Sequence, residues 1–97
     1  MTIKLALFIV RATMAPYTAQ FPVGTRVRIF SRDALDAFRA SWRLHNRLSA
    51  EQLRFAAHDA TVKEVGFYHG GDVLYGLADI PGVWHEACLS RPVDHDV

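Results

Sequence analysis

Lysine and cysteine are scarce in this chain, and neither sign of charge dominates it. Eleven Lys and Arg side chains face ten Asp and Glu, and the only lysines are Lys4 and Lys63. A balance this close to neutral does not favour nucleic acid as a partner. The single cysteine, Cys88, excludes an intramolecular disulfide and an all-cysteine metal site. We therefore expect a reducing, cytoplasmic setting.

Long apolar runs are also missing. The N-terminal run Leu5–Val10 stops at Arg11, whereas a signal peptide needs about 7–15 apolar residues and a bilayer span about 20. We therefore expect no membrane association, and an N-terminal extension over residues 1–15 that contains a strand at residues 3–12. A strand that is apolar on both faces needs cover or a partner strand, which predicts a homodimer.

The remainder has the composition of one globular domain. The chain has 97 residues, of which 51% are hydrophobic, enough for a modest core. We place this domain at residues 16–93, followed by a frayed tail at 94–97.

In the first half of the domain, the spacing of apolar residues changes from that of a strand to that of a helix. Val27 and Ile29 alternate with arginines, which predicts that residues 21–30 open with a turn and become a half-buried strand. An apolar stripe at helical spacing follows, and Ser49 with Gln52 fits a capping box that begins a second helix. We therefore predict a two-helix insertion at residues 32–58. The stripe consists of Leu35, Phe38, Trp42 and His45.

The second half returns to strands. In residues 61–68 the apolar phase slips between Val62 and Val65, which predicts a bulge that Gly66 would permit. Gly70-Gly71 predicts a hairpin to a strand at 72–77. We interpret Pro81-Gly82 as a second turn, followed by a short strand at residues 83–84, one helical turn over residues 85–88 and a final strand.

Several of these segments resemble small SH3-like barrels. The opening Val23-Gly24-Thr25-Arg26-Val27-Arg28, the strand Val65-Gly66-Phe67-Tyr68 and the Pro81-Gly82 turn are similar to the plasmid-borne type II dihydrofolate reductases. Trp84-His85-Glu86-Ala87-Cys88-Leu89-Ser90-Arg91-Pro92 resembles the closing segment of the nitrile hydratase β-subunit barrel. The resemblance implies a mainly β, α+β fold. It would be an SH3-like antiparallel barrel whose two-helix insertion separates the first and second barrel strands.

The resemblance does not carry an activity with it. Type II reductases have Val-Gln-Ile-Tyr after the Pro-Gly, whereas this chain has Val83-Trp84-His85-Glu86. Nitrile hydratases hold their metal in a cysteine-rich motif that this chain lacks. A fold hosts many functions, so the barrel alone assigns none.

The candidate ligand-binding residues gather in the second half: Tyr68, His69, Asp72, Tyr75, Trp84, His85 and Glu86. Aromatic side chains beside Arg26 and Arg28 could line a groove for a peptide or a small molecule. Alternatively, Trp84 and one tyrosine are core residues, His69 lies in solvent and Glu86 caps a turn. Cys88 fits a buried structural cysteine better than a nucleophile.

These observations favour a non-enzymatic binding or assembly module that is homodimeric and holds no cofactor or metal. One alternative is a small oligomeric enzyme with a pore shared between subunits. Another is a metal or small-molecule sensor that uses His69, His85 and Glu86.

Overall fold

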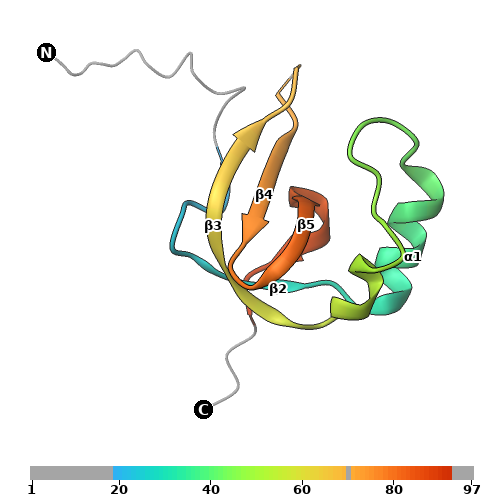
Figure 1. The fold of residues 1–97 in the computed structure, drawn as a ribbon, viewed down its shortest axis with the longest axis horizontal. Coiled ribbons are helices and arrows are strands. Elements are labelled where there is room, and N and C mark those ends of the chain that lie inside the picture. Colours follow the sequence, from blue (N-terminus) through green and yellow to red (C-terminus); the bar gives the residue numbers. More distant parts are fainter. Residues whose placement is uncertain (1–18, 70, 93–97) are drawn as a thin grey trace, which may run out of the picture.

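The computed structural model describes residues 19–69 and 71–92. In these residues the fold is an antiparallel sheet of five strands with one α-helix, so the α+β class is confirmed (Figure 1). The sheet order is β5-β4-β3-β2-β6. The strands are β2 (Arg26–Ile29), β3 (Asp59–Phe67), β4 (Val73–Leu77), β5 (Ile80–His85) and β6 (Leu89–Ser90). The predicted strand at 3–12 and the tail at 94–97 lie outside the described residues.

The helix α1 (Arg32–Ser41) begins after an N-cap at Ser31. The Ala34 N–H donates to Ser31 Oγ at 3.3 Å, which satisfies one of the free N–H groups of the first turn. The predicted stripe ran on to His45, but the helix ends at Ser41 and Trp42 is extended. The Trp42 indole N–H donates to the His45 carbonyl at 2.6 Å. This bond forms within a loop that turns back after Trp42, so the helix does not continue to His45.

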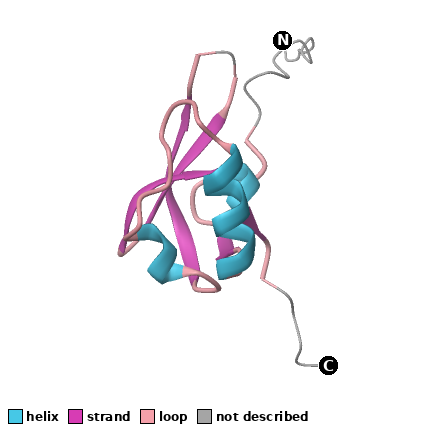
Figure 2. Ribbon diagram, turned by 90° about the vertical axis from the view of Figure 1, so that its right-hand side faces the viewer, coloured by secondary structure: helices cyan, strands magenta, loops and turns pink. Residues whose placement is uncertain are grey.

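The second predicted helix is a 3₁₀ helix, η3 (Gln52–Phe55). Its capping box is reciprocal, as predicted: Ser49 N–H donates to Gln52 Oε1 at 2.9 Å, and Gln52 N–H donates to Ser49 Oγ at 3.2 Å. Ala57 has a φ of 66°, which no helix continues through. Figure 2 shows α1 and η3 on the same side of the sheet.

The β3–β4 hairpin follows the sequence prediction closely. The register shifts between Val62 and Glu64, which confirms the bulge. Gly66 is not part of the bulge, because it pairs regularly with Leu74. At the tip, the Tyr68 N–H donates to the Asp72 carbonyl at 2.8 Å.

The predicted turn at Pro81-Gly82 is wrong. The β4–β5 turn is formed by Ala78 and Asp79, where Asp79 has a φ of 64°, and Leu77 pairs directly with Ile80. Because Tyr75 pairs with Trp84, Pro81-Gly82 lies within β5 as a bulge. Proline lacks an N–H and is tolerated at a bulge or on an edge strand, and β5 is at the edge of this sheet.

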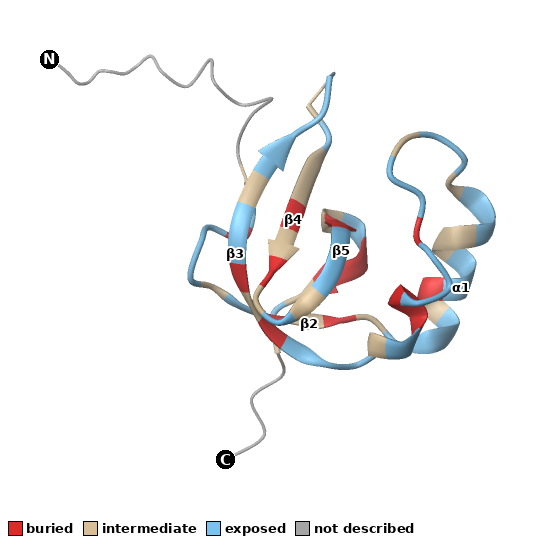
Figure 3. Cartoon of the chain, viewed as in Figure 1, coloured by how far each residue is buried: buried red, intermediate tan, exposed pale blue. Residues whose placement is uncertain are grey.

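The core is formed by buried side chains from the five strands, α1 and η3 (Figure 3). Trp84 and Tyr75 are 0% and 1% exposed, so the interpretation that Trp84 and one tyrosine are core residues is confirmed. The helical turn η4 (Glu86–Cys88) links β5 to β6, as predicted. The other buried apolar residues include Phe21, Val27, Ile29, Leu35, Leu48, Leu53, Val62, Leu77 and Leu89.

Candidate functional site

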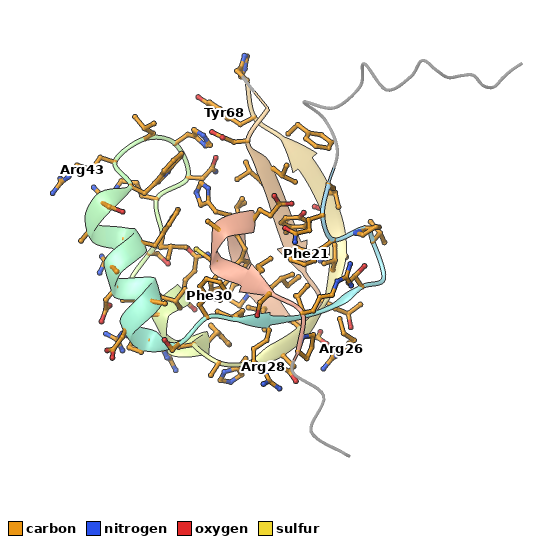
Figure 4. All side chains as sticks on the ribbon, turned by 180° about the vertical axis from the view of Figure 1, so that it is seen from behind. Phe21, Arg26, Arg28, Phe30, Arg43 and Tyr68 are labelled. Carbon is orange, nitrogen blue, oxygen red and sulfur yellow. The ribbon has the colours of Figure 1, made fainter. Side chains whose placement is uncertain are left out.

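The tip of the β3–β4 hairpin is held against the loop that follows α1. The His45 ring stacks on the Tyr68 ring with centroids 3.6 Å apart and planes 12° from parallel. His45 Nε2 lies 2.8 Å from Asp72 Oδ2, and His45 Nδ1 lies 2.9 Å from Asn46 Oδ1. Two oxygen acceptors suit an imidazolium, which donates from both nitrogens. We call His45, Tyr68 and Asp72 the clasp; Figure 4 shows Tyr68 beside the hairpin tip.

His85 supports the clasp from beneath and is 4% exposed. Its Nε2–H donates to the Asn46 carbonyl at 2.7 Å, and its ring lies 5.0 Å from Phe38 and 4.9 Å from Trp42. Burial among these rings lowers the pKa of His85 from 6.5. The Asp72 carboxylate, by its hydrogen bond, raises the pKa of His45 from the same 6.5. The two imidazoles therefore have opposite charge preferences.

These opposite shifts predict two separate histidine titrations. The His45 Cε1–H resonance is expected to titrate above pH 6.5 and that of His85 below it. Because the folded pKa of His45 is raised, its stabilising contribution is complete below its unfolded pKa and is lost as the pH rises through the folded value. The contribution of neutral His85 is present above its unfolded pKa and is lost as the pH falls through its folded value.

The measurement is an NMR pH titration of the wild type and of Asp72→Asn. The variant should bring the His45 midpoint down toward 6.5 and leave His85 the lower of the two. Coincident midpoints in the wild type, or a His45 midpoint that Asp72→Asn leaves unchanged, would contradict the clasp as an ion pair.

Tyr75 and Glu86 belong to a structural network. The Tyr75 hydroxyl donates to Glu86 Oε2 at 2.6 Å and accepts from the Phe21 N–H at 3.2 Å. The Gln20 N–H also donates to Glu86 Oε2, at 2.9 Å. Burial, with the hydrogen bond to Glu86, raises the pKa of Tyr75 to about 12. The network connects the segment before β2 to β4 and η4. Glu86 therefore links separate segments of the chain and does more than cap the turn in which it lies.

The structure brings together some of the seven candidate residues and separates others. Tyr68, Asp72 and His85 converge through His45. His69 is exposed, and its ring lies 5.1 Å from the Tyr68 ring in an edge-type contact. Tyr75 and Trp84 are core residues, with 1% and 0% of their surface exposed.

The two arginines that were expected beside the aromatic residues lie elsewhere. Arg28 forms an ion pair with Asp59 at 2.6 Å, and Arg26 Nη1 donates to Thr61 Oγ1 at 3.0 Å. Figure 4 shows both at the opposite end of the molecule from Tyr68. The predicted groove of aromatic and basic side chains is therefore not assembled by this fold.

A hollow of about 430 Å³ lies on the face of β3, β4 and β5. Gly66 and Gly76 line it without side chains, and a Cβ built on Gly66 would meet no atom within 4 Å. Leu74 and the 42%-exposed Val83 supply apolar surface. We call this the strand-face hollow; its lining also includes Asn46, Lys63, Glu64, Val65, Tyr75, Leu77, Ile80, Pro81 and Gly82.

Sequence reasoning missed both the hollow and the central role of His45. A glycine inside a strand is a signal for close backbone approach, and Gly66 and Gly76 carried that signal. His45 precedes Asp72 by 27 residues, and no local pattern indicates such a contact.

Neither a reactive thiol nor a metal cluster is found in the part of the chain that the structure describes. Cys88 is 1% exposed, and burial raises the pKa of its thiol to about 12, so it stays protonated and inert. Within residues 19–69 and 71–92, His, Cys, Asp and Glu form no group of three that could hold a metal ion. No helix in the same ranges has the length and apolar character needed to cross a bilayer.

Comparison of the chain with protein-family models, curated proteins and solved structures gives no match.

Proposed function

We propose that this chain is a small SH3-like binding module that holds a short peptide segment in the strand-face hollow. The observation that carries the proposal is the hollow itself, about 430 Å³, within the range of about 300–1,000 Å³ typical of ligand sites. Gly66 leaves open space at the backbone, and the apolar side chains of the hollow offer the contact area that a peptide side chain needs.

The dimensions and chemistry of the hollow favour an extended peptide. Leu74–Leu77 of β4 lie along it, a length of about 10 Å that matches about three extended residues. Leu74, Pro81 and Val83 can contact one apolar side chain. Lys63 and Glu64 offer one charge of each sign for the polar groups of the bound segment.

The connection between the sheet edges supports a curled, barrel-like sheet. In a flat sheet, β5 and β6 would lie about 19 Å apart, four strand spacings of about 4.8 Å. The chain from His85 to Leu89 passes through only the turn η4, and four residues span at most about 14 Å. A sheet that bends and brings its edges together, as in an SH3-like barrel, fits this short connection.

The chemistry of the described residues supports binding more than catalysis. Cys88 is buried as a neutral thiol, and His85 donates its Nε2–H to a backbone carbonyl. Neither is arranged as a nucleophile with a base in reach.

The proposal predicts that Gly66→Leu blocks peptide binding without unfolding the protein. The new side chain would occupy the hollow, and the space at Gly66 accepts it. The probe is an arrayed library of short random-sequence peptides, followed by affinity measurement on the peptides that the wild type selects. We expect affinity to fall at least about tenfold.

Ala37→Leu is the matched control, because it adds the same side chain at an exposed position of α1. It should bind the selected peptides like the wild type, and neither variant should unfold at a lower urea concentration than the wild type. A wild type that selects no peptide, or selected peptides that bind Gly66→Leu equally well, would overturn the proposal.

A further inference from the structure

A second hollow, of about 250 Å³, lies beneath the hairpin tip between α1, β5 and η4. It shares no lining residue with the strand-face hollow. We call it the aromatic hollow; it is lined by Phe38, Trp42, Gly71, Asp72, Val73, His85, Glu86 and Ala87.

Three aromatic side chains, Phe38, Trp42 and His85, line the aromatic hollow. Phe38 and Trp42 stack with centroids 5.6 Å apart and planes 13° from parallel, and His85 packs against both. Both rings are half-buried, so part of their surface remains available. The negative face of an aromatic ring attracts a cation.

The rest of the polar lining carries negative charge. Asp72 and Glu86 contribute carboxylates, and no Lys or Arg is among the lining residues. Asp72 pairs with the His45 imidazole through Oδ2, which offsets part of its negative charge, and its side chain is 50% exposed. Glu86 Oε2 accepts from Tyr75 and Gln20. Burial lowers the pKa of His85, so this imidazole stays neutral at neutral pH and adds no positive charge to the lining.

We infer that the aromatic hollow binds a small organic cation, an alkylammonium or guanidinium group. The ring faces would hold its apolar surface by cation–π attraction, while Asp72 and Glu86 supply the opposite charge. Its volume lies below the range usual for drug-sized ligands and suits a single headgroup. This site is separate from the peptide site proposed above and does not depend on it.

The test uses the ¹⁵N-labelled full chain and follows the two indole N–H resonances, assigned with Trp42→Phe. Choline is the probe, and 3,3-dimethylbutan-1-ol is its neutral control of the same shape. We expect choline to shift the Trp42 resonance saturably, while Trp84 stays unchanged. If choline produces no shift, or if the neutral alcohol shifts Trp42 equally, the cation site is overturned.

Charge variants locate the site. Glu86→Gln keeps an acceptor for the Tyr75 hydroxyl and removes the charge, so choline affinity should fall about two- to fivefold, as for exposed ion pairs. Glu64→Gln, in the strand-face hollow, is the matched control and should leave choline binding intact. Equal affinities for wild type and Glu86→Gln would contradict the inference.

Two further arms complete the experiment. Gly66→Leu should bind choline normally, so a failure of the peptide site and a failure of the cation site are distinguishable. Guanidinium and the tripeptide amide Gly-Arg-Gly separate two sources of the same chemistry. Tighter binding of the tripeptide assigns the hollow to a basic side chain of a partner, and tighter binding of guanidinium assigns it to a free cation.

Discussion

Trp84→Ala is expected to lower the free energy of unfolding by about 3–5 kcal/mol. Trp84 is 0% exposed and sits opposite Tyr75 in the β4–β5 ladder. Its removal would leave a cavity in the centre of a small core. It would also remove the indole N–H that donates to the Pro81 carbonyl at 3.1 Å, which holds the bulge in β5.

Urea unfolding followed by circular dichroism measures this loss. Val83→Ala is the matched control, since Val83 is the neighbouring residue and 42% exposed; it should change stability by less than about 0.5 kcal/mol. If Trp84→Ala leaves no folded baseline, Trp84→Phe keeps the prediction testable, with an intermediate cost. A Trp84→Ala cost no larger than that of Val83→Ala would place Trp84 at the surface and contradict the fold.

Gly82→Ala and Gly66→Ala are expected to change stability in opposite directions. Gly82 has a φ of 95°, and a Cβ there would lie 2.6 Å from Gln52 Nε2 and 2.8 Å from Gln52 Cδ. Gln52 is buried and donates to the Val83 carbonyl at 3.0 Å. The alanine would strain the backbone and displace that bond, a loss of about 2–3 kcal/mol.

Gly66→Ala is the control on the same sheet. Its Cβ would enter open space, and its φ lies outside the left-handed region. Alanine reduces the freedom of the unfolded chain, so we expect a gain of about 0.4–1 kcal/mol. The measurement compares the urea unfolding midpoints of Gly82→Ala and Gly66→Ala. Equal midpoints would show that Gln52 does not cover the bulge.

The sequence predicted most of the strands because their apolar residues keep a period of two. The alternation of Val27 and Ile29 with arginines, and the slip between Val62 and Val65, both reflect contact with one core. The capping box at Ser49 was likewise local and therefore predictable.

The incorrect and missed features depend on contacts between distant segments. A Pro-Gly pair is compatible with either a turn or a bulge. Here the pairing of Tyr75 with Trp84 makes Pro81-Gly82 a bulge. The end of α1 coincides with the contact that Trp42 makes with the His45 carbonyl.

The candidate site was only partly predictable for the same reason. Tyr68, Asp72 and His85 could be chosen because polar and aromatic residues gather around the hairpin. The side chain that joins them, His45, lies in the loop after α1, whereas its spacing in the sequence predicts a core position on a helix. Tyrosine and tryptophan are also common on binding surfaces, so the residue types of Tyr75 and Trp84 do not reveal their burial. Their register in β4 and β5 places both side chains in the core.

The most direct test of the binding proposal is where a selected peptide contacts the protein. Backbone amide shifts of the ¹⁵N-labelled chain, recorded as the tightest library peptide is added, should be largest at Gly66, Gly76 and Val83 around the strand-face hollow. Shifts centred instead on Arg26 and Arg28, or no localised shifts at saturation, would contradict the account.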